Sequence, residues 1–411
     1  MAALLRGAIR PLLYLGRDRA HLAGVGGKAG AMKIAGEWLD NEATQTVMAA
    51  LVASGHTALF VGGCVRNALL GVPVGDIDVV TDASPDAVIK VADAAGFRVI
   101  PTGIEHGTVT VIADGLAHEV TTLRRDLQTD GRRAVVSFTG SLAEDAARRD
   151  FTMNALYAQA DGTVIDPLGG LPGLLERRVR FVGDPDRRIA EDYLRILRFF
   201  RFHAIYGDPL LGIDAEGLAA CAANAASIDT LSRERVGAEM RKLLAAVDPA
   251  PALAAMEASG VLAQVLPGAT ARAVAVLAHF EAGLPRDWLC RLAVLGGEEP
   301  TQHLRLSRAE SATLADLRRE IGSPAVPDAL GWLHGEAQAG DILHLRAAVF
   351  ETPLPKSWHD DVVRGANAKF PVTANDLMPA LQGPALGARL RALQDRWLAT
   401  GLTLSRAELL A

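Results

Sequence analysis

The sequence predicts an α+β protein in which a mixed β-sheet near the N-terminal end is followed by a long all-α remainder. Strand patterns are concentrated before Gly170, and several follow one another without an intervening helix. From Asp184 onward, helical patterns separated by proline, glycine and aspartate dominate. Consecutive strands without helices between them indicate a mixed sheet rather than a purely parallel one. With 411 residues, the chain is expected to contain more than one domain.

The predicted elements begin with a helix over residues 41–54 and an apolar strand over residues 58–61, which ends in a glycine turn. Further strands are expected at residues 77–81, 98–101, 108–112 and 118–123, with a helix over residues 85–95 between the first two of these. Proline-rich breaks later in the chain predict where helical subdomains meet. We therefore expect an N-terminal extension (1–31), a sheet-containing head (32–170), a helical neck (171–250), a helical body (251–350) and a helical tail (351–411).

Residues 1–31 carry four arginines among apolar and glycine-rich stretches. No apolar run in this segment is long enough to span a bilayer, so no membrane span is predicted. The segment fits a targeting peptide, a disordered extension, or upstream sequence before a start at Met32, and we expect one of the last two.

The composition indicates a folded protein, because half of the residues are hydrophobic and 22% are charged. The three cysteines have no paired spacing, so neither a disulfide framework nor a zinc site is predicted, and a cytoplasmic location is expected. A net charge of −6 opposes binding to a polynucleotide, yet fourteen arginines and only twelve acidic residues lie between Arg124 and Arg201. That stretch fits either a local cationic site or arginines scattered over the surface.

A glycine turn after the first strand is a candidate phosphate site. Gly62 and Gly63 follow a buried strand and precede a helix, so the backbone can approach a ligand and present N–H groups where an anion is favoured. Arg66, one turn into that helix, can reach the same phosphate. The alternative is an ordinary turn with no ligand.

Two carboxylates are expected on one face of the next strand. Asp76 and Asp78 alternate along it, so both side chains point to the same side of the sheet, where they repel each other unless a cation joins them. Two Mg²⁺ ions held by oxygen ligands can activate an attacking hydroxyl and stabilise a leaving oxygen, which is the chemistry of phosphoryl and nucleotidyl transfer. The alternative is a pair of solvated acids on an edge strand.

The glycine pair, Arg66 and the Asp76/Asp78 pair together resemble the head of the class II tRNA nucleotidyltransferases and bacterial poly(A) polymerases. That family has the nucleotidyltransferase fold of DNA polymerase beta. The resemblance implies that the two aspartates hold two magnesium ions and that the glycines and the arginine bind the incoming triphosphate. Asn67 departs from the family, which usually has aspartate at this position.

Later segments resemble the same family in the expected order. Residues 105–111 (EHGTVTV) and 119–124 (EVTTLR) resemble its later head strands, which makes Glu119 a candidate third carboxylate, with a structural role as the alternative. Residues 148–155 (RRDFTMNA) resemble a signature in which the arginine before the aspartate, here Arg149, contacts substrate. From the residues alone, Arg149 and Asp150 fit equally well as an ion pair at a helix end.

Residues 187–202 are expected to form one helix, with apolar residues between the charges. The resemblance implies that its E-D-x-x-R motif reads the Watson–Crick edge of the incoming base without a template. Asp192 would provide acceptors and Arg195 donors for cytosine or adenine. Arg198 and Arg201 would line the same pocket. From their spacing alone, Asp192 and Arg195 are neighbours on one helix face and would form only a surface ion pair.

Residues 227–244 resemble the family's neck segment and are expected to brace this helix, while the tail is expected to contact the RNA backbone. The implied reaction is attack of a tRNA 3′-hydroxyl on the α-phosphate of CTP or ATP, with release of pyrophosphate, Mg²⁺ as cofactor and no obligatory protein partner. The alternatives are a bacterial poly(A) polymerase, an enzyme that adds only CC or only A, and an inactive RNA-binding module.

Overall fold

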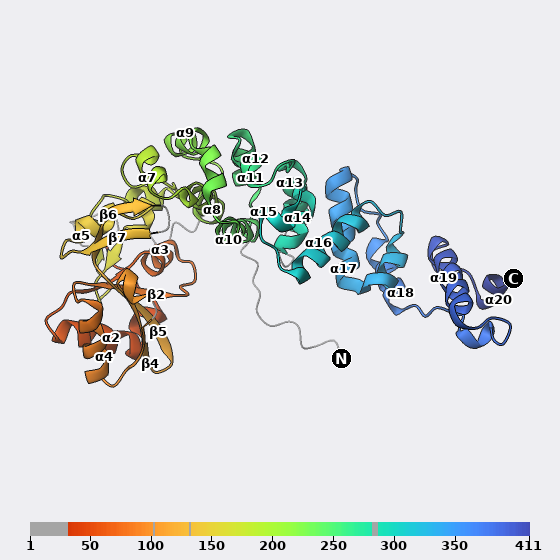
Figure 1. Cartoon of the computed structure of the whole chain (residues 1–411), viewed down its shortest axis with the longest axis horizontal. Helices are drawn as coiled ribbons and strands as arrows, with labels where there is room; N and C mark the ends of the chain where they lie inside the picture. Colours follow the sequence, from red (N-terminus) through yellow and green to blue (C-terminus); the bar gives the residue numbers. More distant parts are fainter. Residues whose placement is uncertain (1–31, 102, 131–132, 282–286) are drawn as a thin grey trace. The chain divides into compact units, whose positions relative to one another are not determined.

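A computed structural model describes residues 32–101, 103–130, 133–281 and 287–411, which form two compact units. Within them, unit 1 contains residues 32–243 and 251–265, and unit 2 contains residues 244–250 and 266–411. The predicted fold class is confirmed, since the strands lie before Gly170 and helices follow (Figure 1). The expected extension over residues 1–31 lies outside the described residues.

Unit 1 is built around a mixed seven-stranded sheet with the order β3-β4-β5-β2-β1-β8-β9. Strands β2 and β5 are parallel, and the other neighbours are antiparallel. The first five strands match the predicted ones, whereas β8 and β9 were not predicted because strands of two residues carry no periodic pattern. The strands are β1 (Ala58–Val61), β2 (Ile77–Thr81), β3 (Arg98–Ile100), β4 (Thr108–Ala113), β5 (Leu116–Thr122), β8 (Tyr157–Ala158) and β9 (Val164–Ile165).

A separate two-stranded sheet, β6 (Arg124–Asp130) and β7 (Arg133–Phe138), follows β5 in the chain. It was not predicted either. The sequence of β6, RRDLQTD, is mostly polar and lacks the alternation of apolar residues that marks a half-buried strand.

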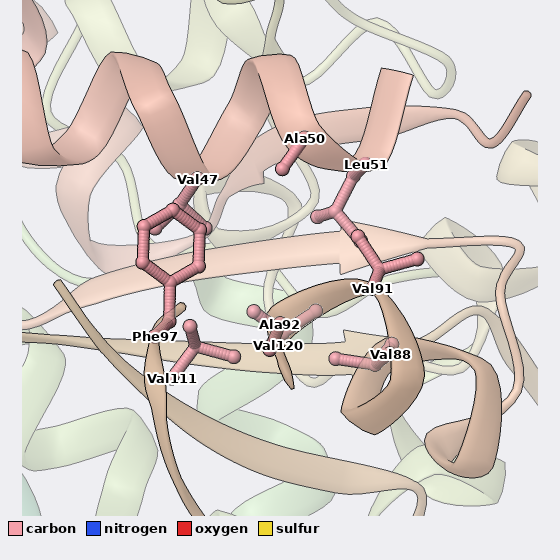
Figure 2. A pocket seen from close by; sticks show the side chains of 9 residues that line it. All are labelled: Val47, Ala50, Leu51, Val88, Val91, Ala92, Phe97, Val111 and Val120. Carbon is pink, nitrogen blue, oxygen red and sulfur yellow. The ribbon is translucent and has the colours of Figure 1, made fainter. Parts of the chain in front are cut away.

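Helices α2 (Glu42–Ala53) and α4 (Pro85–Ala94) pack on one face of the large sheet. Figure 2 shows the small apolar pocket between these helices and strands β4 and β5. It is lined by Val47, Ala50, Leu51, Val88, Val91, Ala92, Phe97, Val111 and Val120. Because successive side chains of a strand point to opposite faces, the residues next to Val120 in β5 point away from these helices.

Further helices complete the chain up to residue 265, and α3 and α8 among them carry predicted site residues. They are α1 (Glu37–Asp40), α3 (Gly63–Leu70), α5 (Leu142–Ala147), α6 (Leu171–Leu175), α7 (Pro185–Glu191), α8 (Leu194–Tyr206), α9 (Ala215–Ala223), α10 (Arg233–Leu244), α11 (Ala250–Ala258) and α12 (Val261–Val265). Buried phenylalanines join α8 to the segment after α5. The ring of Phe151 lies 5.0 Å from those of Phe181 and Phe202.

The prediction of one continuous helix over residues 187–202 is wrong. Asp192 leaves the helical conformation (φ −157°, ψ 105°) and separates α7 from α8. The reason is local hydrogen bonding, because Oδ1 of Asp192 accepts from the backbone N–H of Leu194 at 3.1 Å. Aspartate competes with helical hydrogen bonds in this way and favours a turn or a helix start.

Unit 2 is helical throughout its described regular structure. Its helices are α13 (Arg272–Phe280), α14 (Trp288–Leu295), α15 (Pro300–His303), α16 (Arg308–Ile321), α17 (Pro327–Phe350), α18 (Trp358–Asn367), α19 (Gly383–Ala399) and α20 (Arg406–Leu410). Helix α17 is kinked at Gly335, where φ is 77°. In the described parts of both units, no helix combines the length and the apolar character needed to cross a membrane.

Close helix contact and a buried arginine stabilise unit 2. Gly365 of α18 lies against α17 so closely that a Cβ would come within 1.9 Å of the carbonyl oxygen of Asp328. Arg291 is fully buried on α14. Its guanidinium lies 2.8 Å from Glu281 Oε2 and donates to the carbonyl oxygens of Leu244, Ala246 and Val247.

Candidate active site

The turn between β1 and α3 brings residues from three segments together. Gly62 has φ 69° and ψ −116°, in the region that favours glycine. A Cβ on Gly62 would lie 3.5 Å from Arg149 Nη1, and one on Gly63 would lie 3.7 Å from Arg66 Nη2 and 3.9 Å from Asp78 Oδ2. The glycine pair, the two arginines and the aspartate predicted from sequence therefore share one location.

The carboxylates lie on the face of the sheet opposite α2 and α4. Asp78 is paired with Glu119 in the parallel register of β2 and β5, so the two side chains point to the same side, and Asp76 directly precedes β2. Burial is the main reason that the pKa of Asp78 is raised to about 6, with the nearby carboxylates of Glu119 and Asp76 adding to it. Strand β2 has a neighbour on each side, so the alternative of acids on an edge strand is wrong.

These oxygen donors fit a divalent cation. A cation beside Asp78 would favour its charged form, against the burial and the carboxylate repulsion that raise its pKa. Within the described ranges, no three His, Cys, Asp or Glu side chains are arranged as a ready metal site. Asp76, Asp78 and Glu119 are the residues that would contribute oxygen ligands to such an ion.

Arg66 is held from several sides, with only 7% of its surface exposed. Its guanidinium donates to the side-chain oxygen of Asn154, to that of Asn67 at 2.9 Å, and to the hydroxyl of Tyr206 at 2.7 Å. Burial, the largest influence, lowers the pKa of Arg66 below its ordinary value. Arginine nevertheless stays charged, so a cation faces the glycine turn. Asn67, the departure from the family pattern, contributes to its orientation.

Arg149 is fixed by a carboxylate that the sequence patterns did not point to. Its Nε and Nη2 donate to Oδ2 of Asp145 at 3.1 and 2.9 Å, and the hydroxyl of Tyr157 donates to the same oxygen. Burial acts to lower the pKa of Arg149, but Asp145 outweighs it and the pKa is raised. The alternative of an Arg149–Asp150 ion pair is wrong, because Asp150 pairs with Arg198 instead.

Arg198 and Arg201 of α8 are both engaged by carboxylates. Arg198 Nε donates to Asp150 Oδ2 at 2.7 Å, and Arg201 donates to Glu239 of α10. The guanidinium carbons of the two arginines lie 5.3 and 4.5 Å from the centre of the Phe202 ring. The two arginines are therefore parts of an ion-pair network rather than free cations.

Asp192 and Arg195 have different partners, so the alternative that they pair only with each other is wrong. Oδ2 of Asp192 accepts from Arg235 Nη2 at 2.7 Å, whereas Arg195 donates to Glu191 and, at 2.6 Å, to the carbonyl oxygen of Arg188. Arg235 belongs to α10, which lies within the predicted neck segment. Through this contact α10 braces the start of α8, as predicted.

Several side chains that orient the predicted arginines were missed. Asp145 and Asn154 lie next to and inside the RRDFTMNA motif, which was the signal that could have identified them. Tyr206 and Glu239 lie far along the chain from the groups with which they interact, 140 residues from Arg66 in the case of Tyr206. No local pattern indicates such contacts.

Comparison with known proteins gives a consistent result. The family model "Poly A polymerase head domain" matches residues 58–180, and "Probable RNA and SrmB- binding site of polymerase A" matches residues 211–272. A CCA-adding enzyme of Geobacillus thermodenitrificans is 37% identical over 325 residues, which cover 75% of this chain and 78% of that protein. The human mitochondrial CCA tRNA nucleotidyltransferase 1 is 41% identical over 207 residues, which cover 50% of this chain and 48% of that one.

Solved structures agree with this result. The Bacillus stearothermophilus CCA-adding enzyme in complex with CTP has a TM-score of 0.69 and 29% identity, and the match covers 87% of this chain and 93% of that one. The Thermotoga maritima CCA-adding enzyme complexed with tRNA shares the fold, with a TM-score of 0.66 and 17% identity over 93% of this chain and 98% of that one. This chain is similar to a relative over three quarters of its length, and its nucleotidyltransferase head carries the paired aspartates. It therefore belongs to the family of CCA-adding enzymes.

Proposed function

We propose that this protein builds or repairs the CCA terminus of tRNA by transferring nucleotides from CTP and ATP to the RNA 3′ end without a template. The observation that carries the proposal is the meeting of a glycine turn, the buried Arg66, the half-buried Arg149 and the Asp78 carboxylate on one side of the head sheet. Such a site provides cations for a triphosphate and oxygen ligands for a metal ion. Divalent-metal dependence is typical of the family to which the chain belongs.

Asp76 and Asp78 are proposed to hold two Mg²⁺ ions, with Glu119 as a candidate third ligand. When bound, these ions would supply activation of the attacking 3′-hydroxyl and stabilisation of the departing pyrophosphate. The chain itself orients the nucleotide. The N–H groups at the start of α3 and the guanidiniums of Arg66 and Arg149 bind the triphosphate, in a partly buried setting where charge interactions are stronger than in water.

The start of α8 is proposed to select the base. Asp192 and Arg195 combine acceptors and donors that match the Watson–Crick edges of cytosine and adenine. Their present partners, Arg235 and Glu191, fix both side chains before a base arrives, which lowers the ordering cost of recognition. Arg198 and Arg201 are proposed to line the same pocket, and their ion pairs with Asp150 and Glu239 hold them in place.

The remaining helices are proposed to bind the acceptor end of tRNA by shape and backbone contacts, with the tail over residues 351–411 contributing RNA contacts. The protein is proposed to act in the cytoplasm without an obligatory protein partner. Its three cysteines are free and buried in the structure, which is compatible with a reducing compartment.

One experiment separates this function from its alternatives. Labelled CTP or ATP is supplied with tRNAs whose 3′ ends lack A, CA or the whole CCA, and the products are sequenced. We expect completion to CCA and no further growth. Long adenosine tails would indicate a poly(A) polymerase, arrest after CC or activity only on CC ends would indicate a partial enzyme, and tRNA binding without incorporation would indicate an inactive RNA-binding module.

A further inference from the structure

We propose that Tyr206 is a positioning residue for Arg66: it holds the guanidinium toward the triphosphate site without neutralising its charge. Tyr206 is the last residue of α8, whereas Arg66 lies on α3 of the head. The inference rests on the proposed function, in which Arg66 binds the triphosphate.

The contact has two components. The Tyr206 hydroxyl accepts a hydrogen bond from Arg66 Nη2 at 2.7 Å, and the Arg66 guanidinium carbon lies 4.1 Å from the centre of the Tyr206 ring. Nη2 is also the atom that lies 3.7 Å from the position of a Cβ on Gly63. Tyr206 therefore holds the nitrogen that borders the glycine turn.

The chemistry of the partners distinguishes Arg66 from its neighbours. Arg149, Arg198 and Arg201 each pair with a carboxylate. The hydrogen bonds of the Arg66 guanidinium in the described part of the chain go instead to neutral oxygens, which belong to Asn154, Asn67 and Tyr206.

Neutral partners orient Arg66 and leave its charge for a phosphate. A carboxylate at the position of the Tyr206 hydroxyl would compete with the phosphate for the same guanidinium, whereas a phenol would not. The ring adds a cation–π contact that fixes the plane of the guanidinium. Pre-organisation of this kind improves affinity because less side-chain freedom is lost when the ligand binds.

The alternative is a purely structural role, in which Tyr206 only packs at the end of α8, where its ring lies 5.5 Å from that of Phe202. A packing role would affect all ligands and the fold alike. A positioning role affects only ligands that carry the phosphates. The two roles can therefore be separated by comparing CTP with cytidine.

The test uses the full chain with Tyr206→Phe, which keeps the ring, Tyr206→Ala, which removes it, and Ile205→Ala as a control. Ile205 lies in the same turn of α8 with 40% of its surface exposed. Affinities for CTP, ATP and cytidine are measured by competition binding, and KM and kcat by incorporation into tRNA. Melting temperatures monitor folding.

For Tyr206→Phe we expect the dissociation constants and KM of CTP and ATP to rise roughly 10-fold, the scale of one hydrogen bond from a charged group, with kcat and cytidine affinity little changed. Tyr206→Ala should weaken both triphosphates further, and Ile205→Ala should match the wild type. In an Arg66→Lys background, Tyr206→Phe should add little, because the fork of donors that it orients is absent.

Equal weakening of CTP and cytidine, or full additivity with Arg66→Lys, would overturn the inference. An unchanged affinity for CTP in Tyr206→Phe would do the same. Absence of incorporation by the wild-type protein would instead contradict the proposed function, while the comparison of CTP with cytidine would still measure the role of Tyr206.

Discussion

Replacement of Asp192 by asparagine tests base selection directly, because it exchanges an acceptor for a donor at nearly constant volume. Cytosine and adenine present an amino donor where uracil and guanine present a carbonyl acceptor. Asp192→Asn is therefore expected to improve UTP and GTP relative to CTP and ATP. The change should amount to about 1 to 3 kcal/mol, or roughly 5- to 150-fold in relative kcat/KM.

The accompanying loss of stability should be small. Asp192 and Arg235 form a partly exposed ion pair, with side chains that are 21% and 27% exposed, so neutralising one partner is expected to lower the free energy of unfolding by about 1 kcal/mol or less. The amide oxygen of asparagine can still accept from the N–H of Leu194, which preserves the start of α8. A change in nucleotide ranking would thus not arise from unfolding.

The assay is kcat/KM for all four nucleotides on tRNA primers that lack A or CA, together with thermal denaturation. Arg235→Gln is the matched control, since it removes the same ion pair but leaves the Asp192 carboxylate, and it should keep the preference for CTP and ATP. An unchanged ranking of the four nucleotides in Asp192→Asn would refute the assignment. The same shift in ranking in Arg235→Gln would show that the ion pair, not the carboxylate, matters.

Three other outcomes are expected. Asp78→Asn should abolish incorporation but keep tRNA binding, and near-normal turnover would contradict a metal-binding role. In EDTA the melting temperature of this variant should exceed that of the wild type, because burial and Glu119 disfavour the charged form of Asp78. Arg291→Met should lower the free energy of unfolding in urea by about 3 to 5 kcal/mol, since it removes the buried ion pair with Glu281 and the donor to the carbonyl oxygens of Leu244, Ala246 and Val247. Arg319→Met, at a side chain that is 63% exposed, should change it by at most about 0.5 kcal/mol. In the native state a thiol reagent at pH 8 should leave the cysteines largely unmodified, because burial raises the pKa of Cys64 to about 11 and raises those of Cys221 and Cys290 as well. All three cysteines should react after denaturation. Rapid modification of the native protein would contradict this burial.

Local patterns in the sequence were sufficient for much of the head. The five longer strands of the large sheet and helix α4 follow from apolar periodicity and from the residues that start and stop such elements. The glycine turn and the alternation of Asp76 with Asp78 also follow locally, since both depend on residues close together in the chain. The roles of Asp192 and Arg195 were predicted from resemblance to a family and not from spacing.

The tertiary structure decided which charged groups meet. Arg149 lies between two acidic residues in the chain, Asp145 and Asp150. It pairs with Asp145, whereas Asp150 pairs with Arg198 of helix α8. The placement of β2 between β1 and β5, and hence the burial of Asp78, likewise depends on strand order. The hydrogen bond between Tyr206 and Arg66 joins residues 140 positions apart in the chain. Periodicity records which face a residue occupies on its own element, whereas the partner across the site is set by how the elements pack, and that is a property of the folded chain alone.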